Sequence, residues 1–320
     1  MAAAIEVVHP GWLSLVVDAG RTGYADIGVP LSSALDGLGL AVLNRLLENS
    51  DDAPALEVFG IGFSLAFSAD TTAAITGARV SAFLDGAAVE PWATFHAKAG
   101  SLLRVAGVAG GFRYYVGFAG SMELPRIMGS FSTNLECMFG GFKGRPLIKG
   151  DRIGIAEGRR VDRKAVPESH IPDMSPPHVL RILDGPEKDW LTADSLDKFC
   201  NIEKNLWYSV SAKSNKTGIR LEGEPMAFRE GAAAGGIVSE GMLPGTVQVP
   251  PDGRPIIVLF ERTMGGYARA GVVASADLDR LAHLKPKDRV LFDRVTPDEA
   301  LRLNTARRGY ISSLYKTIGG

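Results

Sequence analysis

The sequence contains only two cysteines and five histidines among its 320 residues. Cys137 and Cys200 are far apart, and neither belongs to a metal-binding spacing, so they indicate reduced thiols rather than a zinc site. A disulfide between them is the less favoured alternative. The histidines are scattered, and we expect surface or hydrogen-bonded positions for them rather than metal ligation. The sequence therefore predicts no metal site.

The sequence also has little net charge and no long apolar run. The 35 basic and 36 acidic residues give a formal net charge of −1, which does not indicate binding to nucleic acid or to an anionic membrane. No stretch of about 18 apolar residues occurs, so we expect no membrane span. The first residues lack a basic region and are interrupted by Glu6, so we expect no secretory signal. These observations together predict a cytoplasmic protein.

Three common catalytic or nucleotide-binding motifs are missing as well. The sequence has no G-x-x-x-x-G-K-[ST] phosphate loop, no G-x-S-x-G nucleophile turn and no H-E-x-x-H zinc motif. These absences argue against a P-loop nucleotidase, an α/β-hydrolase and a zincin-type protease.

Glycine, in contrast, is abundant. The 38 glycines fall mostly between short apolar runs, which is typical of short strands joined by tight turns. The candidate strands are residues 12–17, 56–59, 63–67, 73–76, 79–84, 102–105, 112–118, 179–183, 207–211, 246–249, 255–260 and 270–274. Few helices are expected: residues 33–48 capped by Ser32 or Ser33, a short helix capped by Ser275, and a helix that starts at the capping box Thr296–Glu299. This mainly β pattern favours closed or partly closed β-barrels over a Rossmann-type sheet.

A chain of 320 residues is too long for one ordinary core, so two domains are expected. The polar, proline-rich stretch 157–178 divides the chain nearly in half. We therefore expect an N-terminal domain at residues 1–160, a linker at 161–178 and a C-terminal domain at 179–320.

Each half ends with a similar phrase. Residues 147–155 and 284–292 both look like a turn that carries Asp-Arg and is followed by an apolar strand. This similarity hints that the two halves are related barrels.

The stretch 257–279 is the most informative for function. Its apolar β-branched run ends at Glu261 and Arg262, and Gly265, Gly266 and Tyr267 follow. Glycine permits close backbone approach, so a carboxylate, a guanidinium and a phenol around this turn could form one wall of a binding cleft. The alternative is a hairpin turn whose charges are only solvated. Glu261 is the best placed candidate for a general base.

Two polar patches in the first half could bind substrate. Asp18, Arg21 and Tyr24 directly follow an apolar strand and could lie at a barrel mouth, although Asp18 could instead pair with Arg21 in a turn. A second patch offers small hydroxyl and amide side chains that can satisfy a substrate amide or carboxylate, and that equally form turns and caps. These residues are Ser130, Ser132, Thr133 and Asn134.

Two further patches could bind an anion or orient an amide. Gly140–Pro146 could form a backbone anion nest, to which Lys143 and Arg145 add charge. Lys216 and Arg220 could neutralise an anion, and Gln248 offers both a donor and an acceptor to an amide. The alternative for Arg220 is a structural ion pair with Glu222.

Phrases in this order resemble a known family over about residues 10–300. They are Asp18-x-Gly-Arg-x-Gly-Tyr24, Gly28-Val-Pro, Asp36, Leu56-Glu57, Gly129-Ser-x-Ser-Thr133, Gly140-Gly-x-x-Gly-Arg145, Gly150-Asp151, Gly218-x-Arg-Leu-x-Gly223, Gln248-Val-Pro-x-Asp-Gly253 and Arg262 to Gly265-Gly-Tyr267. The chain resembles the biotin-dependent carboxyltransferase, allophanate-hydrolase-subunit-2-like family. That family includes the C subunit of 5-oxoprolinase, half of the carboxyltransferase region of urea carboxylase, and an antagonist of a sporulation-kinase inhibitor.

The resemblance implies two tandem cyclophilin-like β-barrel domains and a small amide or lactam substrate. It implies a companion subunit of the kinase-inhibitor or allophanate hydrolase subunit 1 type. The leading expectation is a subunit of an ATP-dependent, 5-oxoprolinase-like enzyme that converts 5-oxoproline to glutamate and shares ATP with its partners. One alternative is the carboxyltransferase half of a urea or amide carboxylase, with biotin on a separate carrier. Another is a regulatory binding protein without catalysis.

From their polarity and position, the residues expected to carry the chemistry are Glu261, Arg262, Tyr267 and Gln248. The residues expected to bind substrate are Asp18, Arg21, Tyr24, Ser130, Ser132, Thr133, Asn134, Lys143, Lys216, Arg220, Gly265 and Gly266. Some positions depart from the family pattern: Ser214-Asn-Lys-Thr-Gly218 stands where Ser-Asp-Arg-Met-Gly is usual, and Glu261 where Asp is usual. These departures imply either a shifted substrate preference or a relative that only binds a partner.

Overall fold

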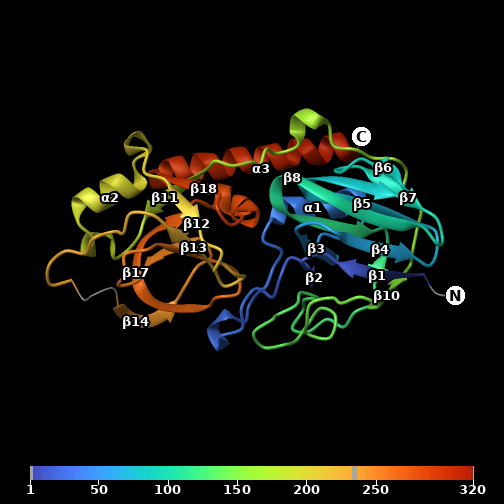
Figure 1. Cartoon of the computed structure of the whole chain (residues 1–320), viewed down its shortest axis with the longest axis horizontal. Coiled ribbons are helices and arrows are strands. Elements are labelled where there is room, and N and C mark those ends of the chain that lie inside the picture. Colours follow the sequence, from blue (N-terminus) through green and yellow to red (C-terminus); the bar gives the residue numbers. More distant parts are fainter. Residues whose placement is uncertain (1–2, 233–235, 320) are drawn as a thin grey trace. The chain divides into compact units, whose positions relative to one another are not determined.

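The computed structural model describes residues 3–232 and 236–319, which form two compact units (Figure 1). Unit 1 comprises Met1–Gly23, Ser32–Met174 and Tyr310–Gly320, and unit 2 comprises Tyr24–Leu31 and Ser175–Gly309. The units differ from the predicted boundaries at three places. Residues 24–31 belong to unit 2, residues 310–320 belong to unit 1, and the predicted linker 161–178 is divided between the units after Met174. The division into an N-terminal domain, a linker and a C-terminal domain stays a prediction.

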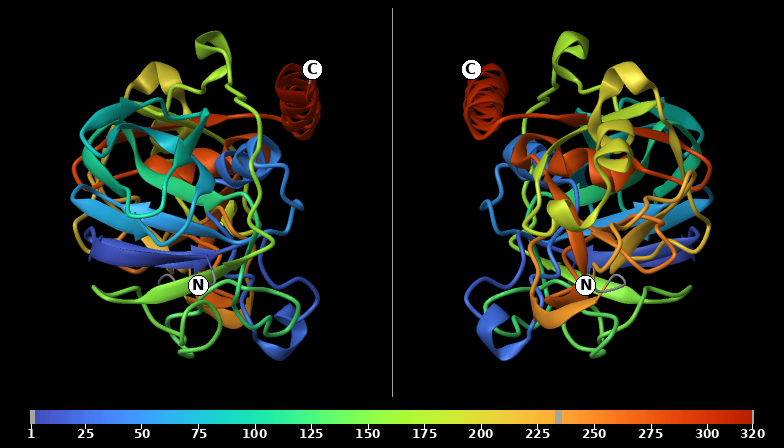
Figure 2. Two further views of the ribbon diagram at one scale, coloured as in Figure 1. Left: turned by 90° about the vertical axis from the view of Figure 1, so that its right-hand side faces the viewer. Right: turned by 90° about the vertical axis from the view of Figure 1, so that its left-hand side faces the viewer.

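Unit 1 is built on a curled antiparallel sheet. Among the described residues its strands are β1 (Ala4–Pro10), β2 (Leu13–Val17), β3 (Ala55–Phe59), β4 (Phe63–Phe67), β5 (Thr71–Leu84), β6 (Ala87–Val89), β7 (Thr94–Ala97), β8 (Leu102–Phe118), β9 (Ser121–Met122) and β10 (Arg152–Ala156). The order is β2-β3-β8-β4-β1-β10-β9, and β5 pairs with β6, β7 and β8. The long strands β5 and β8 curve around an apolar core that contains Phe63, Phe67, Tyr114 and Phe118 (Figures 1 and 2).

Helix α1 (Gly37–Leu46) packs its apolar side in a second core of unit 1. Leu38, Val42 and Leu46 are buried, and they recur at helical spacing. The predicted cap was wrong. The side chain of Asp36 accepts a hydrogen bond from the Gly39 N–H at 2.8 Å, because the helix begins at residue 37 and Ser32 and Ser33 lie too far upstream.

Unit 2 contains a closed barrel of seven strands among the described residues. They are β11 (His178–Asp184), β12 (Tyr208–Val210), β13 (Gly218–Glu222), β15 (Thr246–Val249), β16 (Ile256–Val258), β17 (Met264–Val273) and β18 (Arg289–Arg294). The order β11-β18-β12-β13-β16-β15-β17 closes through a pairing of β17 with β11, and β14 (Gly236–Gly241) pairs with β17. Phe199, Tyr208 and Phe292 stack in its core, with the two phenylalanine rings 4.5 Å apart. The predicted mainly β fold with few helices is confirmed.

The remaining helices show what the sequence predicted and what it missed. Helix α3 (Pro297–Gly319) begins with the predicted capping box, because the Thr296 N–H donates to Glu299 Oε2 at 2.7 Å and the Glu299 N–H donates to Thr296 Oγ1 at 3.3 Å. Ser275 is not a cap: it begins the 3₁₀ segment η5 (Ser275–His283), whose N-cap is Ala274. Helix α2 (Ala193–Cys200) was missed. The short 3₁₀ segments are η1 (Ala25–Ile27), η2 (Glu168–His170), η3 (Lys188–Trp190) and η4 (Ile202–Lys204).

The last turns of α3 belong to unit 1. Leu314 and Ile318 are 0% and 3% exposed and lie in the core of unit 1 that also holds α1. The Tyr310 hydroxyl donates to the His170 carbonyl in the same unit. Figure 2 views this helix, drawn in red, nearly end-on.

The two similar phrases adopt the same turn. The Ile148 N–H donates to Asp151 Oδ2 at 2.8 Å, and the Asp151 N–H donates to the Ile148 carbonyl at 3.2 Å. In unit 2 the Lys285 N–H donates to Asp288 Oδ2 at 3.1 Å, and the Asp288 N–H donates to the Lys285 carbonyl at 3.0 Å. Each aspartate is followed by a strand, β10 or β18. This matching geometry supports the interpretation of the two phrases as counterparts.

None of the helices in the described part of the chain combines the length and hydropathy needed to cross a lipid bilayer.

Candidate active site

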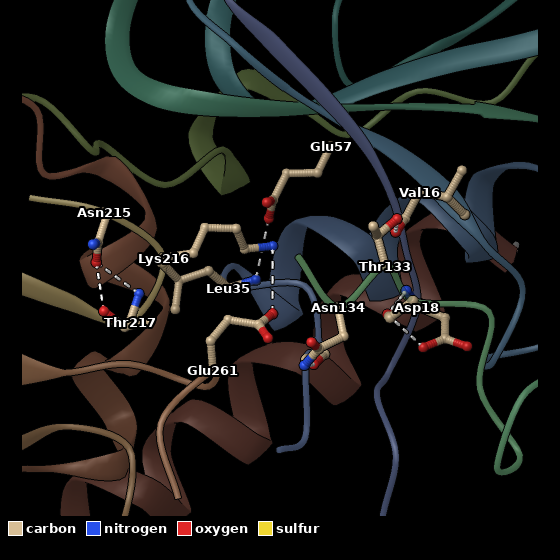
Figure 3. A network of polar contacts seen from close by, with 12 residues as sticks. Val16, Asp18, Leu35, Glu57, Thr133, Asn134, Asn215, Lys216, Thr217 and Glu261 are labelled. Carbon is tan, nitrogen blue, oxygen red and sulfur yellow. Dashed lines mark hydrogen bonds and ion pairs between the residues drawn. The ribbon is translucent and has the colours of Figure 1, made fainter. Parts of the chain in front are cut away.

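Lys216 and Glu261 form a buried ion pair in unit 2, and the sheet explains why they meet. Strands β13 and β16 are antiparallel, with Gly218 opposite Val258. Lys216 lies two residues before β13 and Glu261 lies three residues after β16, so their side chains lie near each other (Figure 3). Lys216 Nζ lies 3.8 Å from Glu261 Oε1, and the side chains are only 12% and 4% exposed. A buried charge pair of this kind is costly to form and is a candidate functional group.

A side-chain turn fixes the backbone on either side of Lys216. Asn215 Oδ1 accepts hydrogen bonds from the Thr217 N–H at 2.9 Å, the Thr217 hydroxyl at 2.6 Å and the Gly218 N–H at 3.2 Å (Figure 3). The Leu259 N–H donates to the Thr217 carbonyl at 3.1 Å, which ties this turn to the segment that carries Glu261. Asn215 was not among the predicted site residues. The sequence feature that could have identified it is an Asn-x-Thr-Gly turn before a strand.

Gln248 and Gly265 lie against each other. Gln248 is buried on β15, and its Nε2 lies 3.6 Å from Met242 Sδ. A Cβ atom on Gly265 would come within 2.3 Å of Gln248 Nε2, so a larger residue here would displace the amide. Arg262 is exposed, and its Nε donates to the Met264 carbonyl at 2.9 Å.

Arg220 and Tyr267 lie elsewhere in unit 2, on a groove of about 780 Å³ whose lining includes neither Glu261 nor Lys216. The suggested Arg220–Glu222 ion pair does not form, because Glu222 Oε1 instead accepts a hydrogen bond from the Ser211 hydroxyl at 2.5 Å. Gly266, on β17, is half-buried. Tyr24 is half-buried in unit 2, and its carbonyl accepts hydrogen bonds from the N–H groups of Ile27 at 3.3 Å and Val29 at 3.1 Å.

In unit 1, the two predicted serines, Ser130 and Ser132, both donate hydrogen bonds to the Asp18 carboxylate. Its Oδ1 accepts hydrogen bonds from the Ser130 hydroxyl at 2.6 Å, the Ser132 hydroxyl at 2.8 Å and the Gly20 N–H at 2.8 Å. Its Oδ2 accepts one from the Phe131 N–H at 2.5 Å. Asp18, Ser130 and Ser132 are all buried, so these groups hold the loop 130–134 against the end of β2.

Arg21 does not pair with Asp18. Its guanidinium donates to the Ile127 carbonyl at 3.2 Å and to the Ser132 carbonyl, and it lies 4.6 Å from the centre of the Phe139 ring. Arg21 thereby also contacts the loop 130–134, through the backbone carbonyl of Ser132. It is 2% exposed, which leaves little of it available to a ligand within unit 1.

The side chains of Thr133 and Asn134 also make hydrogen bonds within the chain. The Thr133 hydroxyl donates to the Val16 carbonyl at 3.0 Å (Figure 3). Asn134 Nδ2 donates to the Ser32 hydroxyl at 3.1 Å, and Asn134 Oδ1 accepts from the Cys137 N–H at 2.7 Å. Both side chains are buried, so the cap-and-turn alternative describes this part of the patch.

The glycine-rich segment 140–144 lies against this loop, and two of its N–H groups are not available for the predicted anion nest. The Gly141 N–H donates to the Phe131 carbonyl at 2.7 Å and the Gly144 N–H to the Gly140 carbonyl at 2.8 Å, so neither is available to an anion. A Cβ on Gly141 would lie 1.9 Å from Thr133 Oγ1. These glycines are therefore needed for packing.

The two cations of that segment have separate environments. Lys143 is exposed, with its ammonium 5.3 Å from the centre of the Phe142 ring. Arg145 makes two hydrogen bonds to Asp151, at 2.7 and 2.8 Å. The guanidinium lowers the pKa of the Asp151 carboxyl.

A buried acid that was not proposed as a site residue lies in the middle of β3. Glu57 is 0% exposed, and its Oε2 accepts hydrogen bonds from the Tyr115 hydroxyl at 3.0 Å and the Leu35 N–H at 3.4 Å (Figure 3). The Asp36 N–H donates to the Tyr115 oxygen at 3.0 Å. Burial, and then the Glu57 charge, raise the pKa of Tyr115 well above its ordinary value. In the sequence, a single acid inside the otherwise apolar run 55–59 could have indicated this buried group.

The described residues contain no group of three or more His, Cys, Asp or Glu side chains placed to hold a metal ion. Cys137 and Cys200 are both free thiols.

Comparison with known proteins connects this geometry to one family. The profile described as "Carboxyltransferase domain, subdomain A and B" matches residues 27–294. The chain is 32% identical to the C subunit of 5-oxoprolinase from Escherichia coli over 97% of each chain. It is 31% identical to urea amidolyase of Saccharomyces cerevisiae, over 97% of this chain and 18% of that protein. The crystal structure of the Kluyveromyces lactis urea amidolyase superposes with a TM-score of 0.90 at 27% identity, over 98% of this chain and 20% of that chain. The chain thus spans about a fifth of that multidomain structure.

Proposed function

Because this chain belongs to the carboxyltransferase domain family of subdomains A and B, we propose that it is a subunit of a 5-oxoprolinase-type enzyme. That enzyme would use ATP to open the lactam of 5-oxoproline and give glutamate. The match to the C subunit of 5-oxoprolinase covers nearly the whole of that protein in both Escherichia coli and Haemophilus influenzae, which supports this choice. We also propose that both units are variants of the cyclophilin-like barrel.

The buried pair of Lys216 and Glu261 is the observation that carries the proposal. A lactam carbonyl is a poor electrophile, so opening it requires oriented donors and a cation near the oxygen that becomes negative. The Lys216 ammonium can supply that positive charge, and the Glu261 carboxylate, 3.8 Å away, can accept a proton. Gln248, held by Gly265, can orient the amide through its donor and its acceptor. Arg262 is exposed nearby in sequence and can bind a substrate carboxylate.

The predicted residues of unit 1 have a supporting role in this proposal. Asp18, Ser130 and Ser132 make their hydrogen bonds to one another and to the loop backbone. We therefore propose that they position the loop 130–134, together with Arg21, rather than contact the substrate.

ATP and the companion subunit enter as parts of the whole enzyme. In the glycine-rich segment 140–144, the N–H groups of Gly141 and Gly144 donate to carbonyls of the chain and are therefore not available to a phosphate group. No step proposed here depends on where ATP binds. The companion would be a chain of the kinase-inhibitor or allophanate hydrolase subunit 1 type.

The test is reconstitution with the companion subunits from the same genome and an assay of ATP-dependent conversion of 5-oxoproline to glutamate. Glu261→Gln keeps the shape of the side chain and removes the base, so we expect kcat to fall by roughly 10²–10⁴-fold. Glu203→Gln changes an exposed acid of the same unit and should leave kcat unchanged. Full turnover by Glu261→Gln in an intact complex would remove Glu261 from the mechanism.

A second candidate function is carboxyl transfer to an amide nitrogen. The close superposition on urea amidolyase over nearly the whole chain favours it. It would require a biotin carboxylase and a biotinylated carrier. A complex that lacks 5-oxoproline turnover but consumes ATP with bicarbonate, carrier and urea would support this function instead. A stable complex that is inactive in both assays would favour the regulatory alternative.

A further inference from the structure

The groove of unit 2 carries two cations that the chain does not neutralise. Lys213 and Arg220 both line the groove and are exposed. Within the described residues, neither the Lys213 ammonium nor the Arg220 guanidinium makes a hydrogen bond or an ion pair. Both groups are charged at neutral pH. The lining holds three cations, Lys213, Arg220 and Arg254, and two carboxylates, Glu222 and Asp252, so its formal net charge is +1.

Asp252 pairs with Arg254, whereas the Glu222 carboxylate accepts a hydrogen bond from a neutral hydroxyl and keeps its charge. Glu222 Oε1 accepts a hydrogen bond from the Ser211 hydroxyl at 2.5 Å. Asp252 lies 3.4 Å from the Arg254 guanidinium, and its Oδ1 accepts the Arg254 N–H at 3.1 Å. Arg254 is thus paired with Asp252, and Lys213 and Arg220 are left as the available cations.

The rest of the lining consists mainly of prolines and one aromatic residue, with Ser211 and Gly223 beside them. Pro250, Pro251 and Pro255 contribute to it, and Tyr267 lines it with 42% of its surface exposed. A volume of about 780 Å³ is within the range of small-molecule sites. An exposed tyrosine offers a face on which a flat ring can stack.

We propose that this groove binds a small molecule that carries a phosphate or carboxylate group on a flat body, the class to which nucleotides belong. The anionic group contacts Lys213 and Arg220, and the flat body lies against Tyr267. The hairpin of β12 and β13 supplies the cations, the turn between β15 and β16 supplies the prolines, and β17 supplies the tyrosine. The groove residues do not include Lys216 or Glu261, so this inference does not depend on the proposed reaction.

The test is equilibrium binding to the purified full chain with ATP, tripolyphosphate and adenosine as separate probes. We expect ATP to bind more tightly than either of the other two, because only ATP combines the anion with the flat ring. The double variant Lys213→Glu, Arg220→Glu should weaken ATP binding by about tenfold or more. Arg308→Glu, which reverses an exposed charge on α3 in the same unit, should change it by less than about twofold.

The tyrosine is tested separately. Tyr267→Phe keeps the ring and should retain ATP affinity, whereas Tyr267→Ala should reduce ATP binding to the level of tripolyphosphate. Circular dichroism spectra that match the parent protein would show that the variants fold. Absence of ATP binding to the parent chain would overturn the proposal, and so would equal binding by the charge-reversed variant. Because no turnover is measured, these outcomes are separate from failure of the oxoprolinase assay.

Discussion

The Asp18 carboxylate should be among the most costly side chains to remove from unit 1. It accepts four hydrogen bonds, from two hydroxyls and two backbone N–H groups, and it is 3% exposed. In Asp18→Ala those donors are left buried without this acceptor. Each such loss costs roughly 1–3 kcal/mol, and because the losses are not additive we expect about 3–5 kcal/mol in total. That is a large share of the roughly 5–15 kcal/mol by which a typical domain is stable.

Asp18→Asn provides an intermediate test. The three hydrogen bonds at Oδ1 can remain, whereas the amide NH₂ at the Oδ2 position would face the Phe131 N–H now 2.5 Å away. Two donors then oppose each other, and we expect a loss of roughly 1–3 kcal/mol. The order of stability should be parent, then Asp18→Asn, then Asp18→Ala.

The assay is urea unfolding of the parent and the two variants, combined with hydrogen exchange of peptides that cover residues 127–144. Exchange should increase in that segment in Asp18→Ala. Asp70→Ala is the matched control, since Asp70 is an exposed acid of the same unit that accepts one hydrogen bond, from the Ala99 N–H. Asp18→Ala within about 1 kcal/mol of the parent would refute the reasoning.

Three further predictions concern unit 1. Gly141→Ala should cost several times more free energy of unfolding than Gly129→Ala, because both have positive φ but only the first Cβ meets atoms of the chain; urea unfolding measures the difference. The Arg145 hydrogen bonds lower the folded-state pKa of Asp151, so its contribution is present above the unfolded pKa of about 3.9 and is lost as pH falls through the folded pKa. Asp151→Asn should therefore flatten the acid limb of a stability–pH profile, and an unchanged limb would contradict this. Leu314→Ala, in α3, should cost roughly 2–5 kcal/mol, whereas the exposed Leu301→Ala should cost about 1 kcal/mol or less by the same assay.

The strands were predictable because glycine turns separate short apolar runs, and most candidate strands coincide with observed ones. Strand β1 (Ala4–Pro10) was missed because Glu6 and His9 interrupt its pattern. Helix α2 was missed because its eight residues hold few apolar positions. The closure of unit 2 depends on the pairing of β11 with β17, which joins residues far apart in sequence and leaves no local signal.

The candidate site was predictable in composition but not in contacts. Glu261 and Lys216 were both proposed, yet their pairing follows from the register of β13 and β16. Asp18, Ser130 and Ser132 were proposed as binding groups because they are polar. In the structure the two serine hydroxyls instead donate hydrogen bonds to the Asp18 carboxylate. The sequence alone does not distinguish a polar side chain that binds a ligand from one that hydrogen-bonds to a neighbouring loop of the same chain.

The position of α3 has a consequence for how the chain folds as it is made. The residues of unit 2 end at Gly309, whereas the second core of unit 1 is incomplete without Leu314 and Ile318. During synthesis, unit 1 emerges from the ribosome first but is completed last. Its apolar surface around α1 therefore stays uncovered while residues 175–309 of unit 2 are translated, and this interval is where a chaperone would act.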